Sequence, residues 1–205
     1  MRWPLLLGLL FGFTVIGTPT MAIEEPKFTV SLHEGVYEIR DYQAAVAAEV
    51  TVAGDQKSAA NKGFRLLAGY IFGGNTRRQS IAMTAPVAQQ RSGEKIAMTA
   101  PVTQTPSDGV WVVRFTMPGG YSLETLPEPN DPKVKLRNVP PARFAVVRFS
   151  GVADQKSVEA KTAELTDFLQ AHHLRTLGPA SLAQYDPPWT LWFMRRNEVM
   201  IELQP

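Results

Sequence analysis

Apolar residues along the chain follow two periods, one typical of strands and one typical of helices. Val36–Tyr42 alternates, and the apolar run Ala44–Ala53 follows it directly, so both segments predict strands. The spacing then becomes helical after Asp55, a suitable N-cap, and Gly73-Gly74 is a suitable stop. The apolar residues expected on one face of this helix are Ala60, Phe64, Leu67 and Ile71.

A similar order of elements follows in the rest of the chain. Val110–Pro118 predicts a strand, and Leu126–Pro132 is a proline-rich break. Arg143–Gly151 predicts the next strand, and a second helix follows, with Val158, Leu165 and Leu169 on one face. The C-terminal run Trp189–Leu203 predicts two strands around a turn at Arg196-Asn197.

The tetrapeptide "DQKS" occurs twice, at Asp55–Ser58 and Asp154–Ser157, and opens the expected helix each time. The matching order of elements predicts two βαββ units, at about residues 36–118 and 139–203. Merged strands of two such units give an α+β fold, in which an antiparallel sheet is flanked by two helices. We expect one domain over residues 23–205, with a groove for a flat ligand between helix and sheet or between the halves.

The heptapeptide "IAMTAPV" also occurs twice, at Ile81–Val87 and Ile96–Val102. With Ser92-Gly93 as a two-residue turn, the copies predict a hairpin with one shared apolar face. The expected pairs are Val87 with Met98, Ala85 with Ala100, and Met83 with Val102. Met83 and Met98 suit core packing better than ligation of a soft metal or haem iron. Pro86 and Pro101 mark an edge, a bulge or a strand end.

Composition and charge narrow the class of protein. The chain has 205 residues, 44% hydrophobic and 20% charged, as expected of a globular domain, and it contains no Cys. A net charge of +2 gives no reason to expect a nucleic-acid partner. At the N-terminus, Met1-Arg2, the apolar run Pro4–Gly17 and the small residues Thr20 and Ala22 have the layout of a secretory signal. We expect cleavage after Ala22 and a periplasmic or secreted protein; the alternative is an uncleaved membrane anchor.

Catalytic and metal-binding signatures are absent from the sequence, so we expect no catalytic residue and no metal site. His172-His173 fall at the expected end of the second helix, where a cation suits the helix dipole. Aromatic residues gather beside Arg195-Arg196, and they are Tyr185, Trp189, Trp192 and Phe193. This arrangement suits a flat apolar ligand with carboxylates, or alternatively a Trp-rich core edge with solvated arginines.

Several segments together resemble the SOUL haem-binding proteins, in the family's order and over about residues 24 to 203. These segments are "EEPKFTV", "YEIRDY", "NKGFRLLAGYIFGGN", "IAMTAPV", "VWVVRFTMP" and "YDPPWTLWFMRRNEV". The resemblance implies a duplicated βαββ fold, a distorted barrel shared with bacterial effector-binding domains of the gyrase-inhibitor type. It also implies non-covalent binding of haem or another tetrapyrrole in a shallow apolar groove.

In the family this groove runs along the first helix and under the loop after "YDPP". The residues that the resemblance places in it are Asn61, Phe64, Arg65, Ala68, Trp189, Thr190 and Trp192. Arg65 is the nearest basic residue for a propionate, and no axial ligand is implied, since Asp41 stands where some relatives have His. The function expected is an exported, non-catalytic carrier, buffer or scavenger of tetrapyrroles. The alternatives are a binding module for another flat hydrophobic molecule and a hydrolase-like enzyme on the same groove.

Overall fold

The computed structural model describes residues 24–91, 109–186 and 189–205, which form an α+β fold. Its strands are β1 (Phe28–Glu34), β2 (Tyr37–Tyr42), β3 (Ala45–Ala53), β4 (Val87–Arg91), β5 (Val110–Thr116), β6 (Lys135–Val139), β7 (Ala142–Phe149), β8 (Ser181–Gln184) and β9 (Asn197–Glu202). Its helices are α1 (Gln56–Ile71), α2 (Gln155–Ala171) and the short 3-10 helix η1 (Trp192–Met194). The fold class predicted from the sequence is confirmed.

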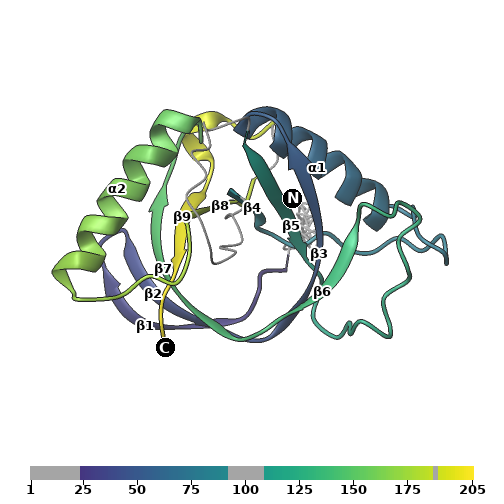
Figure 1. Ribbon diagram of the computed structural model, residues 1–205, viewed down its shortest axis with the longest axis horizontal. Coiled ribbons are helices and arrows are strands. Elements are labelled where there is room, and N and C mark those ends of the chain that lie inside the picture. Colours follow the sequence, from purple (N-terminus) through teal and green to yellow (C-terminus); the bar gives the residue numbers. More distant parts are fainter. Residues whose placement is uncertain (1–23, 92–108, 187–188) are drawn as a thin grey trace, which may run out of the picture.

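The nine strands of the described residues form one curled sheet in the order β1-β2-β7-β9-β8-β4-β5-β3-β6. All of its strand pairs are antiparallel. The pair β4–β8 lies at the middle, with β5 and β3 on one side and β9 and β7 on the other. Helix α1 packs on β3 and β5, and α2 packs on β7 and β9, so the two helices cover opposite ends of the sheet (Figure 1).

The outer strands are exchanged between the halves. Strand β2, which precedes β3 in the chain, pairs with β7 of the other half. Strand β6, which precedes β7, pairs in turn with β3. Each of the two βαββ halves therefore contributes one strand that pairs with a strand of the other half.

The two "DQKS" segments form equivalent helix starts. Asp55 caps α1, and its Oδ1 accepts a hydrogen bond from the Ser58 backbone N at 2.9 Å. Asp154 caps α2 in the same way, through the Ser157 backbone N at 2.8 Å. Each cap satisfies a backbone donor that the first helical turn leaves unpaired. Both predicted starts are confirmed, and α1 ends at Ile71, with Phe72 as the C-cap just before Gly73, whose φ is +106°.

Two hydrophobic clusters hold the helices on the sheet. Leu67, Tyr70 and Ile71 of α1 are buried against a cluster that includes Val113 and Phe115 of β5. The face of α1 centres on Ala59, Gly63, Leu67 and Tyr70, so Ala60 and Phe64 lie at its border and are half-buried. In α2, the predicted face is confirmed, with Leu165 and Leu169 buried and Val158 packed against their cluster.

The first copy of "IAMTAPV" is not a strand, contrary to the sequence prediction. Only Val87 belongs to β4, because Ile81 N donates to Ile71 O at 2.7 Å and Ala85 N donates to Glu24 O at 2.9 Å, away from any ladder. Ile81 is buried, and Met83 packs against the same cluster as α1, which agrees with a packing role for Met83.

The predicted pairing of Val87 with Met98 is wrong. Val87 pairs with Phe115 of β5 on one side and with Gln184 of β8 on the other. Both edges of this residue are occupied, so it has no edge left for Met98. The second copy, its Met98 and the Ser92-Gly93 turn lie outside the described residues.

The C-terminal prediction is half right. Strand β9 exists, but it pairs with β8 and β7, and a loop that contains η1 joins it to β8. The apolar run from Trp189 to Met194 is exposed in this loop and is not a strand. A short apolar run does not by itself distinguish a strand from other structures. Within the described residues, neither α1 nor α2 is long and apolar enough to cross a membrane.

Candidate functional site

The residues predicted on the first helix are accessible along one side of α1. Asn61 and Arg65 are exposed, one turn apart, and Arg65 Nε donates to Asn61 O at 3.3 Å. Ala68 is half-buried on the following turn. The Phe64 ring meets Phe115 edge-on, with 5.4 Å between the ring centroids. Phe64 therefore anchors the helix to the sheet and shows only part of its ring at the surface.

The residues predicted in the loop lie between β8 and β9, and both tryptophans among them are exposed. Trp189 is 83% exposed and Trp192 is 60% exposed. Thr190 is half-buried, and its carbonyl accepts a hydrogen bond from Arg195 Nε at 2.8 Å. The neighbouring Leu191, Phe193 and Met194 are also mostly exposed.

We call residues 189–194 the aromatic loop. Five of its six side chains are large, apolar and more than half exposed. An apolar patch of this kind commonly marks a binding surface, because a soluble domain gains stability by covering it.

The helix residues and the loop residues form two separate groups. In the described part of the chain, no hydrogen bond, ion pair or ring contact joins Asn61, Phe64, Arg65 or Ala68 to the aromatic loop. That the α1 residues and the aromatic loop contact the same ligand remains a prediction.

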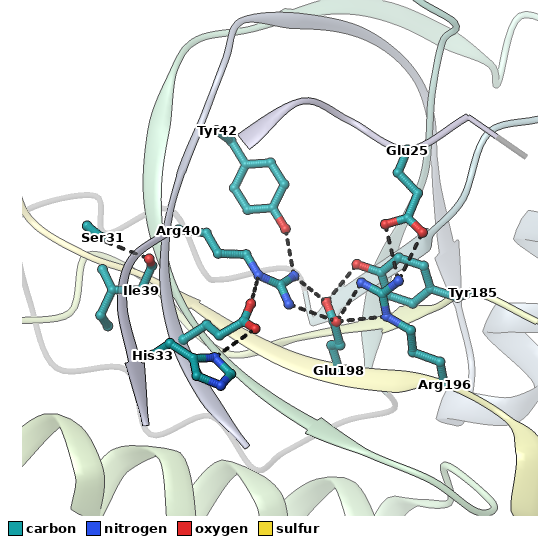
Figure 2. Close-up of polar contacts among 10 residues, drawn as sticks. Glu25, Ser31, His33, Ile39, Arg40, Tyr42, Tyr185, Arg196 and Glu198 are labelled. Carbon is teal, nitrogen blue, oxygen red and sulfur yellow. Dashed lines mark hydrogen bonds and ion pairs between the residues drawn. The ribbon is translucent and has the colours of Figure 1, made fainter. Parts of the chain in front are cut away.

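A buried polar network on the helix-free face of the sheet was not found by sequence reasoning. Its centre is the ion pair between Arg40 of β2 and Glu198 of β9, both at most 3% exposed (Figure 2). The guanidinium contacts both carboxylate oxygens, at 2.7 and 3.0 Å. Arg40 also donates to Glu38 Oε2 at 2.6 Å and to the Tyr42 hydroxyl at 3.1 Å.

Arg196 and Tyr185 complete the surroundings of Glu198. Arg196 Nε donates to Glu198 Oε1 at 3.0 Å, and the Tyr185 hydroxyl donates to Oε2 at 2.6 Å. The Arg196 guanidinium lies over the Tyr185 ring at 3.7 Å and pairs with Glu25 at 2.9 Å, as Figure 2 shows. Arg196 is therefore already paired twice.

The network fixes the charge of its members. Burial on its own would raise the pKa of Glu198, but the hydrogen bonds from Arg40 and Tyr185 and the charges of Arg40 and Arg196 lower it. Burial, together with the charge of Glu198, raises the pKa of Tyr185. A carboxylate held ionised among three donors is a poor proton carrier at neutral pH, so this arrangement suits a structural role better than acid–base chemistry.

Sequence separation explains why the network escaped notice. Arg40 and Glu198 are 158 residues apart and meet only because β7 lies between β2 and β9 in the sheet. A local signal existed in β9, where the charged Glu198 stands directly before the apolar residues Val199, Met200 and Ile201 inside a predicted strand. In the described residues, no group of three or more His, Asp or Glu is placed to hold a metal ion.

The comparisons with known proteins identify the fold first. The C-terminal domain of EcmrR matches with a TM-score of 0.59 at 9% identity, over 82% of this chain and 96% of that one. A hydrolase from Listeria innocua matches with a TM-score of 0.56 at 12% identity, over 85% of this chain and 94% of that one. Identities this low show a shared α+β fold and no more.

The family follows from the sequence match. A family model described as SOUL heme-binding protein matches residues 23–202. The chain belongs to this family, as its motifs predicted. No curated protein is significantly similar to it.

Proposed function

We propose that the protein is an exported, non-catalytic carrier, buffer or scavenger of haem or a related tetrapyrrole. The aromatic loop is the observation that carries this proposal, together with membership of the SOUL family. Its indole and phenyl faces match the flat, apolar faces of a porphyrin ring. Covering one such side chain is worth roughly 1.5–3 kcal/mol, so several such contacts together can offset the entropy lost on binding.

The proposed ligand lies between the aromatic loop and α1. Trp189 and Trp192 contact the ring, and Thr190, Asn61 and Ala68 border it. Arg65 is exposed on α1 and meets a propionate, because a guanidinium binds carboxylates well. Phe64 contributes the accessible part of its ring.

The chemistry of these residues supports non-covalent binding. Neither α1 nor the aromatic loop contains His, and the chain has no Cys for thioether attachment of haem. The residues assigned to the ligand hold it by apolar contact and charge pairing. This mode of binding tolerates porphyrins without iron.

The test is a titration of the purified protein with hemin, followed by the Soret band. Leu191→Glu, in the aromatic loop, is compared with Leu177→Glu, because both leucines are 58% exposed. We expect at least tenfold weaker binding for Leu191→Glu and none of this loss for Leu177→Glu, since only the first places a charge against the ligand. If the two variants bound hemin equally well, the ligand would not bind at the aromatic loop.

A second pair of variants tests the propionate contact. Arg65→Glu and Lys62→Glu make the same change of charge at exposed positions of α1. We expect Arg65→Glu to weaken hemin binding several-fold more than Lys62→Glu does. Absence of saturable binding by the unaltered protein would contradict the proposed function itself. Saturable binding of another flat apolar compound, with the same response to Leu191→Glu, would then favour the alternative ligand class.

Export is proposed from the N-terminal pattern, with cleavage after Ala22. The residues just after this point hold the chain to the fold, since Glu24 Oε1 accepts from Gly119 N at 2.8 Å and Glu25 pairs with Arg196 at 2.9 Å. Cleavage after Ala22 leaves both contacts in the protein. N-terminal sequencing of the exported protein should begin at Ile23, and a chain that keeps residues 1–22 in the membrane fraction would support the anchor instead.

A further inference from the structure

A cavity of about 270 Å³ opens on the helix-free face of the sheet. Its lining comes from both halves, and on β5 it includes Val112, Arg114 and Thr116. The alternate residues Val113 and Phe115 point the other way, into the cluster under α1. We call this space the helix-free cavity; its lining contains none of the residues assigned to the tetrapyrrole.

Most of the helix-free cavity is apolar. Tyr42 and Phe144 meet edge-on at 5.7 Å and, with Met200, pack over the buried residues of β7 and β8. Val112 and Ala88 continue this surface across β5 and β4. An alkyl chain placed here is removed from water along much of its length, at roughly 0.8 kcal/mol for each buried methylene.

One wall of the cavity carries an excess of positive charge. Arg114 and Arg137 both line it, and both pair with the single carboxylate of Glu49. Arg114 Nη2 donates to Glu49 Oε2 at 2.8 Å, and Arg137 Nε contacts the other oxygen. Two guanidiniums share one carboxylate, so this wall has a net charge of about +1 at neutral pH.

The guanidinium of Arg137 can bind a further anionic group. Its side chain is 63% exposed, while that of Glu49 is 12% exposed. Among the residues that the structure describes, none accepts from its terminal Nη groups. Among the lining residues, the acidic group is Glu202 on β9, separated from β5 by β8 and β4, and Tyr42 contributes a phenol. The cavity is therefore positive at one end and negative at the other, which orients an amphiphile.

We propose that the helix-free cavity binds a medium-chain amphiphile with an anionic carboxylate, distinct from the tetrapyrrole. The carboxylate pairs with Arg137 and Arg114, and the chain lies along Val112, Phe144 and Tyr42. At about 270 Å³, the cavity lies just below the roughly 300–1,000 Å³ that is usual for ligand pockets, so a chain of medium length suits it. The charge of the wall selects a carboxylate over an ammonium group.

Calorimetric titration of the purified protein with decanoate, below its micelle concentration, tests this proposal. Decyltrimethylammonium serves as the probe of opposite charge. Arg137→Gln removes the exposed guanidinium, and Arg143→Gln is its matched control, because Arg143 is 46% exposed and pairs with Asp41 at 2.7 Å outside the cavity. Ala88→Phe fills the space, and circular dichroism checks that each variant is folded.

We expect saturable binding of decanoate and much weaker binding of the ammonium probe. Arg137→Gln should weaken decanoate binding about tenfold, as for the loss of one charged hydrogen-bonding partner. Arg143→Gln should leave it unchanged, and Ala88→Phe should abolish it. Equal binding of the two probes, or equal effects of the two arginine variants, would overturn the proposal, as would absence of decanoate binding. The hemin titration of Arg137→Gln should match that of the unaltered protein; a parallel loss would mean that the sites are not distinct.

Discussion

The buried carboxylate of Glu198 gives the sharpest test of the fold. The change Glu198→Gln keeps the shape of the side chain and removes its charge. Arg40, at 3% exposure, is then left as a buried cation without its bidentate partner. Removing one partner of a buried pair commonly costs about 3–5 kcal/mol, because the other charge stays away from water.

The structure places the expected cost at the lower end of this range. Arg40 keeps its hydrogen bond to Glu38 at 2.6 Å, and Arg196 keeps its pair with Glu25 at 2.9 Å. Both contacts offset part of the loss. We therefore expect a free energy of unfolding lower by about 3 kcal/mol. For a chain of this size, that lowers the melting temperature by roughly 6–12 °C.

Chemical denaturation with urea measures the difference, with Asp41→Asn as the control. Asp41 pairs with Arg143 at 2.7 Å, but both side chains are more than a third exposed, so we expect a loss of at most about 1 kcal/mol. The double change Arg40→Met with Glu198→Gln also removes the buried cation and should be more stable than Glu198→Gln alone. If Glu198→Gln were as stable as the original chain, or the double variant less stable than the single one, the account of the network would be refuted.

Three further predictions concern stability. Asp55→Ala and Asp154→Ala should each lower the free energy of unfolding by about 1 kcal/mol in thermal melts, because both remove equivalent N-caps; a large difference between them would contradict the equivalence. Gly63→Ala should cost about 1–3 kcal/mol in urea denaturation, since its Cβ would lie 2.5 Å from Val113 Cγ2, and unchanged stability would show that the helix moves freely. The pKa of Glu198 is lowered in the folded state from its ordinary value of 4.5, so its contribution to stability is present above that pH and is lost as the pH falls through the lower, folded value. Acid titration of the original chain should therefore show a loss of stability below about pH 4.5 that is smaller in Glu198→Gln.

Local signals were sufficient where a segment's structure depends on its neighbours in the chain. The N-caps Asp55 and Asp154 are confirmed, because a cap needs only the backbone of the next turn. The buried faces of both helices followed from spacing alone, although that of α1 is shifted by one position toward Gly63. A glycine gives no hydrophobic signal, so sequence periodicity could not show that α1 approaches the sheet there.

Apolar patterns in the sequence were a poor guide where the hydrogen-bond partners of a segment lie outside that segment. "IAMTAPV" looked like a strand, yet Ile81 and Ala85 bond to the end of α1 and to Glu24. The run from Trp189 to Met194 also looked like a strand, yet it lies exposed beyond β8. Of the predicted site, the aromatic residues are accessible as expected, while their meeting with Arg65 and Asn61 stays a prediction.

The sequence by itself determined the class of fold, the starts of both helices and the family. Only the tertiary structure decided how the strands are exchanged, that Glu198 meets Arg40 and Arg196, and that two arginines share Glu49 beside an apolar cavity. The reason is physical. Caps and amphipathic faces are set by interactions within a few residues, whereas pairing across a sheet joins residues whose separation along the chain carries no trace of their contact.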